Sequence, residues 1–276
     1  MPMRFTYLAD RSFTYLLMIL FALFFFIPLV WLFTASVSTD ANFALKIPEV
    51  ISFEHYARLF EEGDVISWLG NSFILSISTM VLTAVLSTLA AYPLSRVEFP
   101  GKFALMYGIL LSRVLPISSI IVPIFSISIF LGLVNTYIGT ILVLTALQLP
   151  VALWIMKGFV DTIPVEIEES AWLDGCNRFS GLIRIVLPLT APGIAVTGLF
   201  AFLGSWSDFL VPFILIRSPQ MLPISTGLFR AFGERGSVEF GTLAALAVLY
   251  SAPAVVIYFF ARNNLVKGMT AGGVKA

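Results

Sequence analysis

Charged and metal-binding side chains are scarce in this sequence. Only 12% of its 276 residues are charged, with 16 Lys and Arg against 16 Asp and Glu, whereas soluble domains carry about 25%. One cysteine, Cys176, and one histidine, His55, exclude an internal disulfide and a His/Cys metal cluster. The zero formal net charge gives no electrostatic reason to expect a nucleic-acid partner. No cluster of catalytic side chains stands out, so we expect neither an enzyme nor a metal site.

Apolar residues take the place of the missing charges. They make up 59% of the chain, and its mean hydropathy is +0.97. A helix that crosses a membrane needs about 20 mostly apolar residues. Stretches of that length with at most one charge lie around residues 12–39, 65–95, 103–125, 137–156, 189–216 and 240–261. The sequence therefore predicts an all-α membrane protein with six transmembrane helices in contact with lipid.

The basic residues favour one orientation of these spans. If the N-terminus is cytoplasmic, most Lys and Arg residues outside the spans fall in cytoplasmic segments, as the positive-inside rule requires. We therefore expect both termini in the cytoplasm and the loops 40–64 and 217–239 outside. The first span exceeds the roughly 7–15 apolar residues of a signal peptide, which favours an uncleaved anchor.

A polar segment, residues 157–188, lies between the fourth and fifth predicted spans. Its acidic first part predicts a short helix that Asp161 or Thr162 caps. Gly175 predicts the end of this helix, because glycine readily adopts the left-handed conformation. Asn177 then predicts the start of a second helix with one apolar face, formed by Phe179, Leu182, Ile183 and Val186. Such a helix either lies on the membrane surface or docks into a groove of another protein.

The stretch "EESAWLDGCNRFSGLIRIVLPLT", residues 168–190, resembles the EAA loop of the membrane subunits of bacterial and archaeal ABC importers. Ser170 stands where an alanine is usual, and Leu182 replaces a common phenylalanine. The positions that match the motif are Glu169, Ala171, Asp174, Gly175, Leu187 and Pro188. The stretch "SWSDFLVPFILI" and the end of the chain, "LVKGMTAGGVKA", resemble the carbohydrate-importing group, and the latter resembles the second permease of maltose-type systems.

The resemblance implies a type I ABC importer permease in a prokaryotic cytoplasmic membrane. Residues 65–262 would form the ABC type-1 transmembrane domain, preceded by the first span and its external loop (1–64) and followed by a cytoplasmic tail (263–276). The implied partners are a second permease in a heterodimer, two copies of a P-loop ATPase and an extracytoplasmic sugar-binding protein. The sequence lacks a G-x-x-x-x-G-K-S/T stretch, so ATP and Mg²⁺ would be bound by the ATPase, with no cofactor in this chain.

In this family the EAA loop is a mechanical joint that docks in a cleft of the ATPase. Glu169 would contact a basic group there. Asp174 would cap the turn or bond backbone amides in it, and Gly175 would permit the sharp bend. Docking would rest mostly on the apolar face around Leu182 and Ile183. Pro188 would set the beginning of the fifth span.

Arg113 and Asp208 are ionisable residues inside predicted spans, where burial in lipid is costly. They could pair with each other or line a pathway. Asp208, with Trp206 and Ser207, could lie on the route of a hydroxyl-rich solute. Trp206 by itself is more typical of an interfacial anchor than of a ligand.

A self-contained secondary transporter or channel remains the alternative, but it predicts inverted repeats, and none is convincing here. Two smaller features complete the expectations. His55 is predicted to be an ordinary polar position of an external amphipathic helix. The tail is either disordered by default or reaches the ATPase interface.

Overall fold

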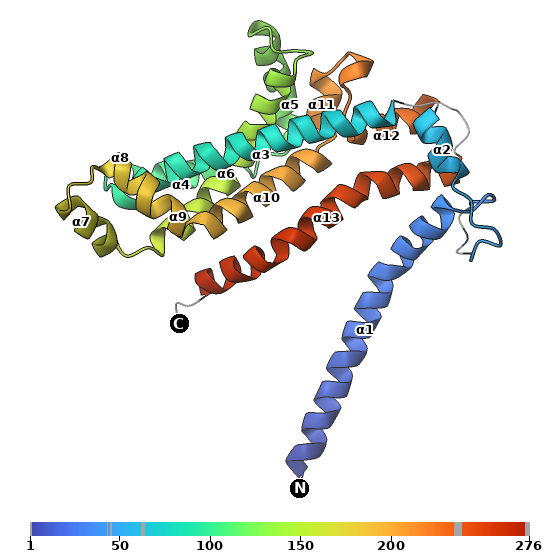
Figure 1. Ribbon diagram of the computed structural model, residues 1–276, viewed down its shortest axis with the longest axis horizontal. Helices are drawn as coiled ribbons and strands as arrows, with labels where there is room; N and C mark the ends of the chain where they lie inside the picture. The colour runs from blue at the N-terminus through green and yellow to red at the C-terminus, as the bar shows by residue number, and fades with distance from the viewer. Residues whose placement is uncertain (1, 43, 45, 62–63, 235–238, 274–276) are drawn as a thin grey trace. The chain divides into compact units, whose positions relative to one another are not determined.

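The computed structural model describes the backbone of residues 2–42, 44, 46–61, 64–234 and 239–273, and side chains within 13–42, 44, 46–61, 64–229 and 239–259. In this part of the chain regular structure is helical, apart from one isolated antiparallel bridge between Ser38 and Ile51 (Figure 1). The all-α prediction is confirmed. The chain divides into two compact units, Met1–Val65 with Leu228–Ser251 and Ile66–Gly227 with Ala252–Ala276.

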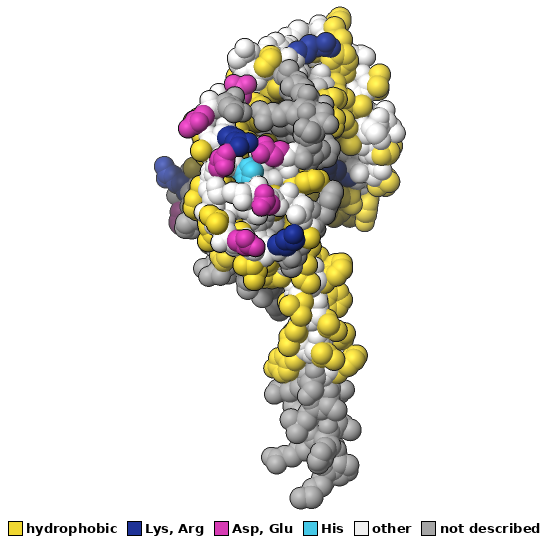
Figure 2. All heavy atoms as spheres, turned by 90° about the vertical axis from the view of Figure 1, so that its right-hand side faces the viewer, with side chains coloured by type: hydrophobic (Ala, Val, Ile, Leu, Met, Phe, Trp, Pro, Cys, Tyr) yellow, Lys and Arg dark blue, Asp and Glu magenta, His cyan; other side chains and the backbone are white. Residues whose placement is uncertain are grey.

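The first unit holds α1 (Pro2–Ser36), α2 (Glu54–Glu61) and the start of α13 (Phe240–Gly273). The apolar part of α1, Phe13–Ser36, has a mean hydropathy of 2.8, and no residue of its most apolar stretch is buried within the chain. Figure 2 shows the hydrophobic side chains of this helix uncovered. The surface of α1 therefore needs lipid or another subunit to cover it.

The second unit is built on α3 (Val65–Arg96), α6 (Tyr137–Asp161) and α10 (Ala191–Ser207), which run side by side (Figure 1). Glycines allow α6 and α10 to approach closely. A Cβ atom on Gly193 would meet the Phe159 side chain at 2.4 Å, and one on Gly204 would meet the Gln148 amide at 2.4 Å. Small residues at helix contacts are the usual means of close packing in membranes.

The third predicted span is not a continuous helix. It consists of α4 (Lys102–Leu111) and α5 (Ile117–Phe130), with a turn around Arg113 between them. Pro116 stands in an extended conformation, φ −65° and ψ 135°, directly before α5. Because proline lacks an amide hydrogen and disfavours a helical residue before it, the chain breaks here.

The fifth and sixth predicted spans also differ in extent from the expectation. The helix of the fifth predicted span ends at Ser207. The rest of that predicted span forms the short α11 (Leu210–Leu215), and the 3₁₀ turn η2 (Pro219–Met221) and α12 (Ile224–Glu234) come after it. The backbone of α13 stays helical to Gly273. The default expectation of a disordered tail was therefore wrong as far as Gly273, while the side chains of the tail lie outside the described residues.

Six spans stay a prediction. Within the described residues, four helices are long and apolar enough to cross a membrane: α1, α3, α6 and α13. A fifth span is added if α10 is counted with the segment Arg178–Leu189, to which it is bent by 76°. Neither α4 nor α5 meets the length requirement alone.

Two apolar clusters hold the second unit together. One packs the end of α3 against α6 and the segment before α10, with Leu94, Met156, Val160, Leu182 and Val186 buried. The other packs α3 against α5, α6 and α11, with Leu75, Ile121, Leu144, Val211 and Leu215 buried. The first cluster is the platform for the segment that resembles the EAA loop.

Candidate functional site

The first helix of that segment, α7 (Val165–Leu173), begins without a side-chain cap. Asp161 and Thr162 close α6 instead: Thr162 is its C-cap, and the Thr162 hydroxyl donates to the Phe159 carbonyl at 2.7 Å. The prediction that either residue caps α7 was therefore wrong. Pro164 stands at the N-cap position of α7 with an extended backbone, and a proline side chain has no oxygen that could accept from the first N–H groups of the helix.

The predicted glycine turn is confirmed. Gly175 has φ +90°, in the left-handed region, and its N–H donates to the Trp172 carbonyl at 3.1 Å. The Cys176 N–H donates to Ala171 at 3.0 Å, which closes the C-terminus of α7. Asn177 caps the next helix as predicted, because its Oδ1 accepts from the Ser180 N–H at 2.7 Å.

The second helix does not have a single apolar face. It consists of α8 (Arg178–Gly181), the π-helix η1 (Leu182–Val186) and α9 (Leu187–Leu189). Leu182 and Val186 are buried, whereas Ile183 is 46% exposed and Phe179 is 67% exposed. A π-helix has more residues per turn than an α-helix, so the spacing expected for an α-helix does not keep these residues on one side.

This splits the predicted docking surface. Leu182 packs into the chain's own core against Met156 and Val160, so the expectation that it docks on a partner was wrong. Among the apolar side chains of the segment that remain uncovered are Phe179, Ile183 and Leu173, which is 90% exposed at the end of α7. Exposed side chains of this size in a polar segment mark a contact surface.

The acidic residues of α7 lie in opposite environments. Glu169, the residue that matches the motif, is exposed, as are Glu166 and Asp174, the C-cap residue of α7. Glu168 is fully buried and forms an ion pair with Arg96 of α3 at 2.7 Å. Sequence reasoning missed this pair, because two adjacent glutamates look alike in a sequence.

The fifth span begins later than predicted. Pro188 lies within the short α9, and the chain bends at Thr190, whose hydroxyl donates to the Val186 carbonyl at 2.8 Å. The helix α10 then begins at Ala191, with Pro192 in its first turn. Proline is well placed there, because the first-turn N–H groups have no partner within the helix.

Arg113 and Asp208 do not form an ion pair with each other among the described residues. The Arg113 Nη2 donates to Gln148 Oε1 of α6 at 3.3 Å. Asp208 is half-buried and caps α11, because its Oδ1 accepts from the Val211 N–H at 2.9 Å. The Ser225 hydroxyl donates to the Asp208 carbonyl at 3.0 Å.

The two neighbours of Asp208 differ in exposure. Trp206 is buried and stacks on Phe202, with ring centroids 5.5 Å apart, and it also meets the ring of Phe73 edge-on at 5.0 Å. Within this chain Trp206 is a core residue. Ser207 is exposed, and its hydroxyl donates to the Leu203 carbonyl at 2.8 Å.

Gln148 was missed in the sequence, although it is the only side-chain amide in its predicted span. It lies against Gly204 of α10 and accepts from Arg113, so two polar side chains meet at this point beside α10. A primary amide offers two donors and one acceptor oxygen, which suits a solute rich in hydroxyl groups.

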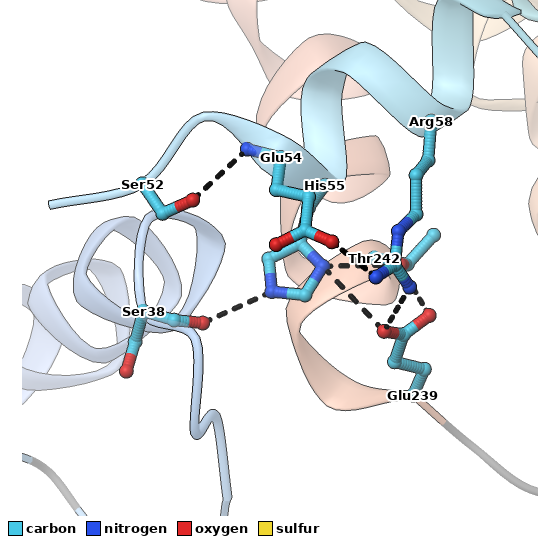
Figure 3. Close-up of polar contacts among 7 residues, drawn as sticks. All are labelled: Ser38, Ser52, Glu54, His55, Arg58, Glu239 and Thr242. Carbon is cyan, nitrogen blue, oxygen red and sulfur yellow. Dashed lines mark hydrogen bonds and ion pairs between the residues drawn. The ribbon is translucent and has the colours of Figure 1, made fainter.

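A second polar cluster occupies the first unit and surrounds His55 (Figures 2 and 3). His55 is buried; its Nε2 lies 2.9 Å from the Ser38 carbonyl, and its Nδ1 lies 3.2 Å from the Thr242 hydroxyl. Because the carbonyl can only accept, Nε2 carries a proton. Arg58 completes the cluster by pairing with Glu239 at 2.9 Å.

His55 is therefore not an ordinary polar position, and that prediction was wrong. It joins α2 to the first turn of α13, where a Cβ atom on Gly241 would lie 2.0 Å from Nε2. The periodicity of α2 alone could not show which of its polar residues turns inward.

Comparison with known proteins assigns the chain to a protein family. Residues 83–271 match the family described as "Binding-protein-dependent transport system inner membrane component". The chain belongs to this family. This chain is 33% identical over 266 residues to the maltodextrin transport system permease protein MdxG of Bacillus subtilis (strain 168), with 95% of each chain covered. It is also 33% identical to the galactooligosaccharides transport system permease protein GanQ of the same organism, again with 95% of each covered.

The fold of this chain is that of an ABC importer permease. A crystal structure of a bacterial ABC transporter involved in the import of the acidic polysaccharide alginate matches with a TM-score of 0.82 and 20% identity, covering 92% of this chain and 97% of that one. A second alginate transporter structure, in complex with an alginate-pentasaccharide-bound periplasmic protein, matches with a TM-score of 0.67 and 21% identity. The type I permease fold of a multi-pass membrane protein is thus confirmed.

Proposed function

We propose that this chain is a permease subunit of an ATP-binding-cassette importer that moves an oligosaccharide delivered by an extracytoplasmic binding protein. Family membership supports the transport role, and the curated relatives carry maltodextrins and galactooligosaccharides by name. The binding-protein partner is supported by the alginate transporter structure solved with a periplasmic protein. Both termini and the α7–α9 segment face the cytoplasm, in line with the distribution of basic residues.

The observation that carries the proposal is the exposed segment α7–Gly175–α8. It places Glu169 on the surface together with Leu173 and Phe179, while Leu182 and Val186 of η1, which follow it, are anchored in the core. A charged residue beside two large apolar side chains is suited to a cleft in another protein, where the apolar groups supply most of the binding energy. We assign this surface to a P-loop ATPase that binds ATP and Mg²⁺ in its own site.

Affinity purification of the chain from its native membrane, with partners identified by mass, tests the proposal. We expect a P-loop ATPase and a second, different permease to arrive together. A chain that purifies alone and moves solute without ATP after reconstitution would instead be a self-contained transporter or channel. The binding protein found with the complex can then be screened against oligosaccharides.

Asp208 tests the pathway part of the proposal. Its Oδ1 accepts the Val211 N–H, and the amide oxygen of an asparagine could accept the same bond, so Asp208→Asn should preserve the start of α11. If the carboxylate lies on the solute route, we expect uptake to fall while the amount of assembled complex stays unchanged. Uptake and complex yield are compared in the same membranes. Normal uptake by this variant would make Asp208 a capping residue only.

A further inference from the structure

We propose that Arg96, with Glu168 and Tyr92, forms a positioning clamp that makes the helix α7 move as one body with the end of α3. This inference rests on the proposed function, because it concerns how a displacement of α7 by an ATPase reaches the membrane helices. None of the three residues is a position that matches the motif, and none is part of the exposed surface assigned to the ATPase.

The contacts converge on one buried carboxylate. The Arg96 Nε donates to Glu168 Oε1 at 2.7 Å, and the Tyr92 hydroxyl donates to Glu168 Oε2 at 2.9 Å. Both oxygens of Glu168 are therefore held by groups of α3. Tyr92 and Arg96 are four residues apart, so they project from the same face of that helix.

The same guanidinium also binds the end of α6. The Arg96 Nη2 donates to the Ile163 carbonyl at 2.9 Å and to the Val160 carbonyl at 3.2 Å. One side chain thus joins α3, the C-terminus of α6 and α7. The planar guanidinium can serve a carboxylate and two carbonyls at once, which a lysine ammonium cannot do in the same geometry.

Burial makes the clamp hard to open. The Glu168 side chain is fully buried, and that of Arg96 is 10% exposed. Separating two such groups would leave a buried charge without its partner, which is strongly unfavourable. A force on α7 is therefore expected to move α3 rather than to part the ion pair.

Pulsed electron paramagnetic resonance on the complete transporter, with its ATPase and second permease, tests this. Spin labels are attached at Glu166→Cys on α7 and Val85→Cys on α3, both exposed positions, after Cys176→Ser. We expect the same label-to-label distance in the nucleotide-free and the vanadate-trapped states. A distance that changes on trapping in the otherwise unaltered protein would overturn the proposal, because α7 would then move independently of α3.

The second arm removes the clamp without leaving a buried charge. In the Arg96→Met/Glu168→Leu double variant, the distance should shift or broaden between the two states. A distance that stays constant in this variant would also overturn the proposal, since something else would then tie α7 to α3. The Arg96→Lys variant should lie between the double variant and the unaltered protein, because a lysine keeps the charge but not all the contacts.

The control is an ion pair on the same part of the chain that does not reach α7. Lys102 pairs with Glu98 at 2.8 Å, so Lys102→Met/Glu98→Leu should leave the distance constant. If this control shifted like the double variant, the clamp would not be specific, and the proposal would fail. Absence of any ATPase from the purified complex would refute the proposed function itself, independently of the distances.

Discussion

Replacing Gly175 with valine is expected to leave the subunit assembled but to uncouple transport from ATP hydrolysis. Gly175 has φ +90°, and nothing lies within 4 Å of a Cβ atom built there. The cost is therefore conformational: a left-handed backbone costs an L-residue roughly 1–2 kcal/mol, and a β-branched residue suffers more. The turn can relieve this by changing the angle between α7 and α8, which disturbs the surface around Leu173 and Phe179.

The measurement is the amount of sugar imported per ATP hydrolysed by the reconstituted complex, with the sugar identified through its binding protein. Gly101 offers a matched control, because it has φ +86° and is equally open. Gly101→Val introduces the same strain before α4, and it should leave the ratio unchanged. Gly175→Asn should retain more coupling than valine, since asparagine tolerates the left-handed region. A normal ratio in Gly175→Val would show that the turn does not transmit the movement.

Glu169→Lys is expected to have a similar effect by a different cause, as it would place a positive charge opposite the basic ATPase group that we propose as the partner of Glu169. Glu166→Lys on the same helix, also exposed, is the matched charge reversal away from the motif position. Normal uptake by Glu169→Lys would argue strongly against the assigned contact.

The second large effect is expected on stability, at Gly139 in the first turn of α6. A Cβ atom there would lie 2.2 Å from the carbonyl oxygen of Leu133 and 2.8 Å from its Cβ atom. That carbonyl is fixed, because it accepts the Thr136 hydroxyl at 2.7 Å in the loop that caps α6. Gly139→Ala therefore forces the backbone of α6 away from the backbone at Leu133, and we expect a loss of about 1–3 kcal/mol or more in unfolding free energy.

Gly158 near the other end of α6 is the matched control. Nothing lies within 4 Å of a Cβ atom at that position, so Gly158→Ala should be neutral or stabilise the helix by up to about 1 kcal/mol. Both variants are compared by thermal unfolding in detergent. Equal midpoints for the two alanine variants would contradict the close contact between Leu133 and α6.

The sequence was most informative where local chemistry decides the structure. Long apolar runs predicted α3 and α6, because few other structures satisfy the backbone in lipid. Gly175 and Asn177 were predicted correctly, since a left-handed turn and a helix cap each depend on one residue and its immediate neighbours.

It was least informative where a side chain's environment depends on distant parts of the chain. Glu168 and Glu169 are neighbours, yet one is buried against Arg96, which lies 72 positions earlier. Leu182 became a core residue because a π-helix changed the register. Likewise His55 finds its partner Thr242 at a separation of 187 residues. No periodicity within one helix encodes such contacts.

The break at Arg113 bears on how the protein is made. At 1.5 Å per residue, the 10 residues of α4 and the 14 residues of α5 extend about 15 Å and 21 Å, short of a hydrocarbon core of about 30 Å. Neither helix can therefore integrate into the bilayer as an independent unit during synthesis. The ribosome must deliver α6, which packs against both, before this part of the chain settles. Biogenesis of the subunit is thus cooperative at its centre, and a nascent chain that ends before α6 should be a substrate for membrane quality control.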